Sequence, residues 1–237
     1  MNLLLSLDFW LHVFLRSVIF NLRYLPLRQA LRLPILVRKA RFRRLGGKVS
    51  IEAERVTFGM IKMGWQYSGA WADNGVSWHN EGSVVFRGRA NIGGDTFFLI
   101  LKGGSVKLGD DFRAAAAIKV ISACGISFGK QCRVGWGSII MDTNCHPLYD
   151  MERQRFTKSH GPIVIGDNNW FGTGCLVLHS VETPRRAIFA AKTVLSRSGN
   201  KVMEPYCVHG GEPLRVLKRN VTRREDHEQI DFSVEEV

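Results

Sequence analysis

The chain has 237 residues, of which 45% are hydrophobic and 23% are charged. This composition excludes a disordered chain and an integral membrane bundle, and it predicts one folded domain with an appendage. The 33 lysines and arginines exceed the 21 aspartates and glutamates, for a formal charge of +12. Such a charge predicts an acidic partner: nucleic acid, anionic lipid, a phosphorylated cofactor or an acidic glycan.

The positive charge is concentrated at the N-terminus. Residues 1–45 hold nine arginines and lysines against one acidic residue, Asp8, which gives +8 of the total +12. A general nucleic-acid coat would spread its charge over the whole chain. The sequence also lacks a helix-turn-helix, zinc-finger or RNP-type motif, so we expect no nucleic-acid partner.

The chain begins with an apolar run in which Asp8, His12 and Arg16 recur every four residues. This spacing predicts an amphipathic helix with one polar stripe, and the polar residues disfavour a membrane-spanning helix. The run lacks the basic start and the cleavage site of a secretory leader. Two placements stay open: packing on the protein or another subunit, or peripheral contact of residues 1–45 with an anionic membrane.

Five cysteines are present, an odd number, and no two of them form a CxxC pair. The pattern predicts neither a zinc knuckle nor a disulfide framework. We therefore expect a reducing, cytoplasmic environment, with the N-terminal helix placed at the inner face of the plasma membrane if it contacts lipid. The cysteines are Cys124, Cys132, Cys145, Cys175 and Cys207.

The middle of the chain repeats with a period of six residues. From Ile165 the sequence divides into IGDNNW, FGTGCL, VLHSVE, TPRRAI, FAAKTV and LSRSGN, and five of the six first positions are apolar. The same frame runs from Phe128, from Leu108 and from Phe86, with short insertions such as KGGSVK between groups. A period of six excludes simple amphipathic strands and helices as the repeating unit.

Hexapeptide repeats predict an all-β fold, a parallel β-helix. Each repeat supplies a short strand and a corner: the first residue points inward, and the glycine that follows tolerates the tight corner backbone. Three repeats make one coil, and coils stack about 4.8 Å apart. We expect an N-terminal helical segment and cap over residues 1–65, the β-helix over 66–200, and a C-terminal cap and polar tail over 201–237.

Three motifs resemble a known family: VGWGSIIMDTNCHPLYD, IGDNNWFGTGCLVLHSVETPRRAIFAAKTVLSRS and GGEPLRVLK, which together cover about residues 84–219. The chain resembles the left-handed β-helix acyltransferases of the hexapeptide class, specifically the sugar and polysaccharide O-acetyltransferases. Its first 65 residues are similar to the N-terminal block of capsule and lipopolysaccharide members. The resemblance implies left-handed winding, a homotrimer, and acyl-CoA bound in clefts between neighbouring prisms.

His146 is the candidate catalytic base. It lies where IMDTNC ends and an irregular loop, HPLYDMERQRFTKSHGP, leaves the repeats. A sugar hydroxyl is a poor nucleophile until a base removes its proton, and the family's catalytic histidine has this sequence context. Asp142 or Asp150 would orient the imidazole, or equally cap a turn. Asn144 is a candidate for binding the acceptor hydroxyl, and Cys145 is expected to pack.

The resemblance also assigns residues to acetyl-CoA, the expected co-substrate. The backbone amide of Thr173 would donate to the thioester oxyanion. Basic residues near the C-terminus would meet the CoA phosphates, although solvated surface is an equally ordinary role for such residues. The cofactor candidates are Trp170 as a wall of the pantetheine channel, Thr173 and Ala191 through the main chain, Ser196 and Arg197 near the nucleotide, and Arg215 and Lys218 at the phosphates.

Three departures from the family pattern bear on the acceptor and the cleft. Ala115 replaces the acceptor-binding asparagine of small-sugar members, which favours a larger glycan. Lys192 replaces a usual glycine, and TPRRAI replaces a coil that normally begins Ile-Gly.

The sequence therefore predicts an enzyme that transfers acetyl from acetyl-CoA to a hydroxyl of a surface polysaccharide or its precursor. A γ-class carbonic anhydrase shares the fold, but His146, His160 and His179 lack its zinc spacing, so we expect no metal. Two alternatives stay open. One is an N-acyltransferase on a nucleotide-linked amino sugar, and the other is a non-catalytic β-helix scaffold.

Overall fold

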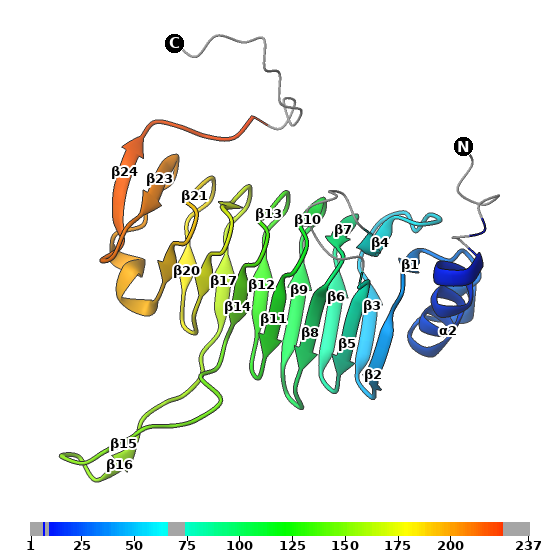
Figure 1. The fold of residues 1–237 in the computed structure, drawn as a ribbon, viewed down its shortest axis with the longest axis horizontal. Helices are drawn as coiled ribbons and strands as arrows, with labels where there is room; N and C mark the ends of the chain where they lie inside the picture. The colour runs from blue at the N-terminus through cyan, green and yellow to red at the C-terminus, as the bar shows by residue number, and fades with distance from the viewer. Residues whose placement is uncertain (1–6, 8–9, 66–73, 225–237) are drawn as a thin grey trace.

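The computed structural model describes residue 7 and residues 10–65 and 74–224. The chain forms an elongated prism with a helical cap at one end and a hairpin that projects from its side (Figure 1). Three sheets, parallel except for the final strand of face A, form the faces of the prism, and the chain visits them in the order A, B, C from β1 to β22. The predicted parallel β-helix is therefore confirmed.

Each of the first six coils contributes one strand to each face, and the strands of a face are hydrogen-bonded in the order given. Face A holds β1 (Ile35–Val37), β4 (Ile61–Trp65), β7 (Ala90–Gly93), β10 (Phe112–Ala114), β13 (Arg133–Val134), β18 (Trp170–Phe171), β21 (Ile188–Phe189), β23 (Cys207–Gly210) and β24 (Arg215–Arg219). Face B holds β2 (Arg41–Leu45), β5 (Val76–Asn80), β8 (Thr96–Ile100), β11 (Lys119–Ser122), β14 (Ile139–Met141), β19 (Leu176–Val177) and β22 (Val194–Leu195). Face C holds β3 (Lys48–Ile51), β6 (Ser83–Phe86), β9 (Ser105–Leu108), β12 (Ile126–Phe128), β17 (Ile163–Ile165) and β20 (Glu182–Thr183).

The core is a column of side chains from the first position of each hexapeptide. These residues are at most 5% exposed, because alternate strand residues point into the prism. In-register pairing stacks each one on its equivalent in the next coil. They include Ile92, Leu108, Val120, Phe128, Val134, Ile140, Ile165, Phe171, Val177, Phe189 and Leu195.

The corners have a different rationale from the one expected. The glycine at the second position does not have a positive φ; that conformation falls at the fourth position, where Lys192 has φ 63°. A Cβ built on Gly109 would lie 2.3 Å from the backbone of Gly129 in the next coil. Glycine is therefore needed for close approach between coils. The fourth-position residues with positive φ are Asp95, Asp111, Ala117, Gln131, Gly137, Asn168, Gly174, Ser180, Arg186 and Lys192.

The β-helix begins at Ile35, before the expected boundary at residue 66. Strands β1, β2 and β3 pair in parallel with β4, β5 and β6 and so form a complete first coil. The connection between β3 and β4 is longer than a hexapeptide corner, so this coil has no six-residue period in the sequence. The helical segment thus ends at Ala30.

The N-terminal cap consists of a π-helical segment (Trp10–Phe14), α2 (Leu15–Tyr24) and α3 (Leu27–Ala30). Helix α2 lies against β1 at the end of the prism (Figure 1). The Asn21 amide donates to Ile35 O at 2.6 Å, Ile35 N–H donates to Asn21 Oδ1, and Val37 N–H donates to Ser17 Oγ at 2.9 Å. Two helix side chains thus take the place of the neighbouring strand that β1 lacks on this side.

The expected packing of the N-terminal helix on the protein is confirmed for one of its faces. Val13 and Phe20 are buried, and Arg16 donates to Ala40 O at 3.3 Å. Asp8, the first residue of the predicted polar stripe, lies outside the described residues. Among the described helices, none is long and apolar enough to cross a membrane.

Candidate active site

A long excursion leaves the prism between β14 on face B and β17 on face C. It carries the two-stranded hairpin β15 (Tyr149–Asp150) and β16 (Arg155–Phe156), which projects from the body (Figure 1). Asn144 N–H donates to Ser159 O at 2.7 Å, and Gly161 N–H donates to Asp142 O at 3.0 Å. The root of the excursion is therefore a closed, hydrogen-bonded neck.

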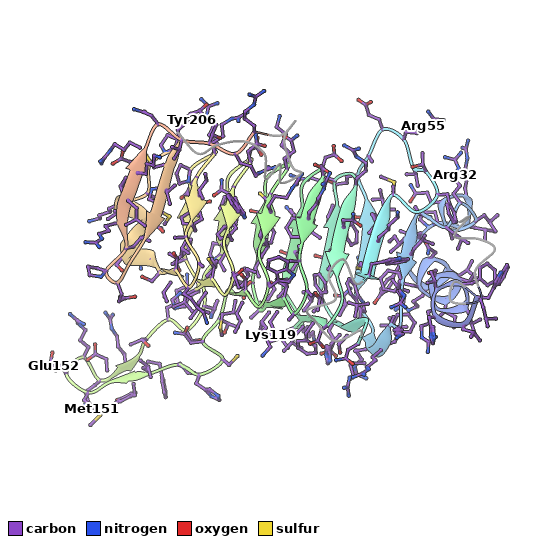
Figure 2. All side chains as sticks on the ribbon, turned by 45° about the horizontal axis from the view of Figure 1, so that its top comes forward. Arg32, Arg55, Lys119, Met151, Glu152 and Tyr206 are labelled. Atoms are coloured by element: carbon purple, nitrogen blue, oxygen red, sulfur yellow. The ribbon has the colours of Figure 1, made fainter. Side chains whose placement is uncertain are left out.

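His146 lies two residues beyond Asn144, at the outer end of this neck. Its side chain is exposed and makes no hydrogen bond or ion pair with another described residue. Cys145 is also exposed, and its N–H donates to Thr143 Oγ1 at 2.9 Å, so the expectation that this thiol packs is wrong. The hairpin tip, marked by Met151 and Glu152 in Figure 2, extends away from the prism.

Asp142 is fully buried and caps a turn in the preceding coil. Its carboxylate accepts hydrogen bonds from Ser122 Oγ at 2.7 Å and from three backbone N–H groups, those of Ala123, Cys124 and Gly125. Within the described chain no hydrogen bond joins Asp142 to His146. Of the two roles expected for Asp142, the structure shows the turn-capping one. No contact between Asp142 and His146 supports the prediction that the carboxylate orients the imidazole.

The carboxylate of Asp150 likewise caps the turn that follows it. Its carboxylate accepts the N–H groups of Glu152 and Arg153 and pairs with the Arg153 guanidinium at 3.0 Å. The backbone hydrogen bond from Arg153 lowers the pKa of the Asp150 carboxyl, with further lowering by the Arg153 side chain. Neither expected aspartate therefore contacts His146.

A second histidine, His179, lies at the neck; from the sequence we considered it only as a zinc ligand. The side-chain amide Nδ2 of Asn144 is 3.2 Å from Nε2 of His179, whose Nδ1 is 3.2 Å from Ser180 Oγ. The repeats indicate that His179 lies near this loop. His179 is the third residue of VLHSVE and Asp142 is the third residue of IMDTNC, two residues before Asn144. The register of β14 on β19 places these positions in neighbouring coils.

The corner between faces A and B presents unused backbone donors. Thr173 and Ala191 occupy this corner in successive coils, with Lys192 N–H donating to Thr173 O at 2.8 Å. Both residues are exposed, and their own N–H groups make no hydrogen bond to another described residue. The corner also presents Trp136, 40% exposed and one coil before Thr173, which sequence reasoning did not single out.

Two other cofactor candidates share one row on the outer surface of face A. Trp170 is aligned with Ile188, Ile188 with Val208, and Val208 with Lys218. The indole of Trp170 is 44% exposed. Arg215, at the start of β24, is aligned with Gly210 of β23. Trp170, Arg215 and Lys218 thus lie on the same face, next to the corner that carries Thr173.

The remaining cofactor candidates lie on the opposite edge of face B. Ser196 and Arg197 follow β22 at the corner between faces B and C, one coil beyond His179. Ser196 lines a hollow of about 180 Å³ together with Val194 and Leu214. Within a single chain, the predicted site residues therefore form two groups. Group AB holds Trp170, Thr173, Ala191, Arg215 and Lys218, and group BC holds Asn144, His146, Ser196 and Arg197, with His179.

Comparison with known proteins finds relatives that are named as acetyltransferases. No protein-family model matches the chain. It is 27% identical over 117 residues to a Dictyostelium discoideum protein named as an acetyltransferase, which covers 49% of the chain and 58% of the relative. It is 22% identical over 121 residues to the polysialic acid O-acetyltransferase of Escherichia coli O1:K1, covering 51% of the chain and 38% of the relative. The matches thus span about two fifths to three fifths of these relatives.

Among solved structures, the crystal structure of the polysialic-acid-specific acetyltransferase NeuO superposes with a TM-score of 0.53. It shares 14% sequence identity, and the match covers 81% of this chain and 92% of the other. At this identity the likeness establishes the fold, which is all-β with a short N-terminal helical segment. Its hexapeptide repeats, its left-handed parallel β-helix and its relatives named as O-acetyltransferases make this chain similar to the hexapeptide-repeat acyltransferases.

Proposed function

We propose that this protein transfers an acetyl group from acetyl-CoA to a hydroxyl of a surface polysaccharide or its precursor, with His146 as the general base. The observation that carries the proposal is the exposed His146 imidazole, held at a hydrogen-bonded neck at one edge of face B. The free amides of Thr173 and Ala191 lie at the other edge. A base and an oxyanion donor are the two elements that acyl transfer requires.

The reaction proceeds by direct transfer in a ternary complex. The imidazole of His146 accepts the hydroxyl proton while the hydroxyl oxygen attacks the thioester carbonyl carbon, forming the C–O bond. The negative charge on the carbonyl oxygen is stabilised by the Thr173 N–H. The tetrahedral intermediate collapses by breaking the C–S bond, and the thiolate of CoA takes the proton from the imidazolium. Atoms and charges balance without a metal.

Both groups of residues come together when chains assemble around a threefold axis parallel to the prism. If face B of each chain points to the axis, rotation places the AB corner of one chain beside the BC corner of the next. Group AB of one protomer then faces group BC of its neighbour. A homotrimer would thus contain three sites, each shared between two chains.

The outer surfaces of the prism support this orientation. From β8 onward face B presents mainly half-buried apolar side chains, interrupted by the exposed Lys119, whereas face C presents mainly serines, lysines and a glutamate. Apolar surface of this extent marks an interface in soluble proteins. The projecting hairpin adds exposed apolar side chains that its own chain leaves uncovered, such as Leu148 and Phe156 at 69% and 68% exposure. The face B residues are Phe97, Leu99, Ile121, Ile139, Met141, Leu176, Leu178 and Val194.

A glycan polymer or its precursor is the acceptor we favour. Ala115 lies at the AB corner and has no polar side chain with which to bind a small sugar. Trp136, at the same corner, offers an aromatic surface of the kind that packs on sugar rings. The polysialic acid O-acetyltransferase among the relatives makes polysialic acid the first polymer to test.

The test is CoA release from acetyl-CoA, measured by trapping the free thiol, with polysialic acid and a panel of oligosaccharides and amino sugars as acceptors. We expect His146→Ala to lower kcat by about 10²–10⁴-fold, the usual contribution of a general base. His160→Ala is the matched control, because His160 is an exposed histidine on the opposite strand of the same neck and should leave kcat unchanged.

His179→Ala separates two roles at the neck. If His179 positions Asn144 for the acceptor, this variant raises KM for the acceptor and leaves kcat nearly unchanged. A variant His179→Ala that loses kcat, beside a His146→Ala that retains it, would move the base to His179. Activity with amino sugars alone would establish N-acyl transfer instead.

A further inference from the structure

The N-terminal cap exposes a continuous apolar stripe. Leu11, Leu15, Ile19 and Leu22 are spaced by four, four and three residues, which places them on one side of a helix. Their exposed fractions are 59%, 64%, 45% and 53%. Leu27 and Leu31 extend the stripe past the end of α2 at 65% and 73% exposure. We call these six residues the cap stripe.

The cap stripe points away from the protein. The opposite side of α2 is fully buried: Ser17, Phe20 and Asn21 are each 0% exposed and contact the first coil. Ser17 and Asn21 are fixed by hydrogen bonds to β1, so the helix cannot rotate to bury its leucines without breaking them. The helix lies at the end of the prism, far from the hairpin of β15 and β16 (Figure 1).

Positive charge lies beside the cap stripe. Arg23 and Arg28 flank it on the helices, Arg32 follows, and Figure 2 shows Arg32 at this end of the molecule. Arg28 is exposed and makes no ion pair within the described part of the chain. The first 45 residues carry nine basic residues and one acidic residue. Two such caps would repel each other, so this surface fits a negatively charged partner better than a second copy.

We propose that the cap stripe and its arginines dock this protein on an anionic lipid bilayer. The leucines would insert at the boundary between headgroups and acyl chains, and the arginines would contact the lipid phosphates. The helix would lie in the plane of the membrane. Since β14 is the fifth strand of face B, His146 leaves the prism four coil spacings, or about 19 Å, from the first coil. An acceptor tethered to lipid would thus be within reach.

The test is sedimentation of the full chain with vesicles of phosphatidylcholine alone or of equal parts phosphatidylcholine and phosphatidylglycerol. We expect binding only to the mixed vesicles, weakening as salt is raised. The variant L11S/L15S/L22S should reduce the bound fraction by about tenfold or more. Arg23→Glu with Arg28→Glu should reduce it to a similar extent.

Matched controls lie on face C, where Val164 is 43% exposed and Lys107 is exposed. Val164→Ser and Lys107→Glu should bind as the wild type does, and circular dichroism would verify that every variant is folded. Absence of wild-type binding to mixed vesicles would overturn the proposal, as would unaltered binding of L11S/L15S/L22S. If the wild type does not bind vesicles and the L11S/L15S/L22S variant loses self-association, the cap stripe is an interface with another protein chain. The assay needs no catalysis, so its outcome is independent of the proposed reaction.

Discussion

Asp142 has two possible roles from the sequence, and the structure is needed to distinguish them. From the sequence, an aspartate four residues before His146 is an orienting group or a turn cap. In the fold it accepts one hydroxyl and three backbone N–H groups from residues 122–125. A buried carboxylate with this many donors is a structural element, and it holds the coil from which the neck of the long excursion leaves the prism.

Asp142→Ala should therefore destabilise the protein. It leaves donors of the 122–125 turn without an acceptor, and each unsatisfied group costs about 1–3 kcal/mol, so we expect the free energy of unfolding to fall by at least about 3 kcal/mol. Urea unfolding measures this. Asp150→Ala, at an exposed turn, should cost less than about 1 kcal/mol. If folded Asp142→Ala instead shifts the pH profile of kcat, the carboxylate acts on the base after all.

At the scale of the element, the hexapeptide carries most of the predictable information. Its first position predicted the buried column, and its six-residue period predicted the β-helix, because both are local properties of strand and corner. The function of the second-position glycine was not predictable, because the atoms that it must avoid belong to the next coil. The repeat register places His179 near Asp142, but its contact with Asn144 was not predictable, because the two residues are 35 apart in sequence.

Gly109→Ala tests the close-approach explanation. The added methyl group would lie 2.3 Å from the backbone of Gly129, so the coils must separate locally, and we expect a loss of about 3 kcal/mol. Gly46→Ala is the control, because its nearest neighbour to an added Cβ is 3.8 Å away. That change should stay within about 0.5 kcal/mol. Equal thermal unfolding midpoints for the two variants would contradict this explanation.

At the scale of the whole molecule, the division of the candidate site into two groups could not be predicted from the sequence. The resemblance named both sets of residues but not their places on the prism. Groups AB and BC lie on the two edges of face B, so neither alone brings together a base and an oxyanion donor. The first coil was equally hidden, because its long connections break the period.

Leu99→Glu on face B should dissociate the proposed trimer. A carboxylate without a partner in an apolar interface costs several kcal/mol, and the loss is repeated in each protomer. Analytical ultracentrifugation should show three chains for the wild type and one for the variant, with CoA release lost together with assembly. Val85→Glu, a half-buried valine on face C, should remain assembled. A Leu99→Glu protein that stays a trimer would place the interface elsewhere.

The side chains of Ser17 and Asn21 that bond β1 have a consequence beyond packing. A stack of identical coils has two open ends, and an open end offers unpaired backbone groups that can recruit further strands. Here side chains of helix α2 bond the first strand of face A, and the antiparallel strand β24 ends the same face at the other end. Both features hinder the addition of further strands to face A, and they therefore oppose the growth of the coil stack into a fibre.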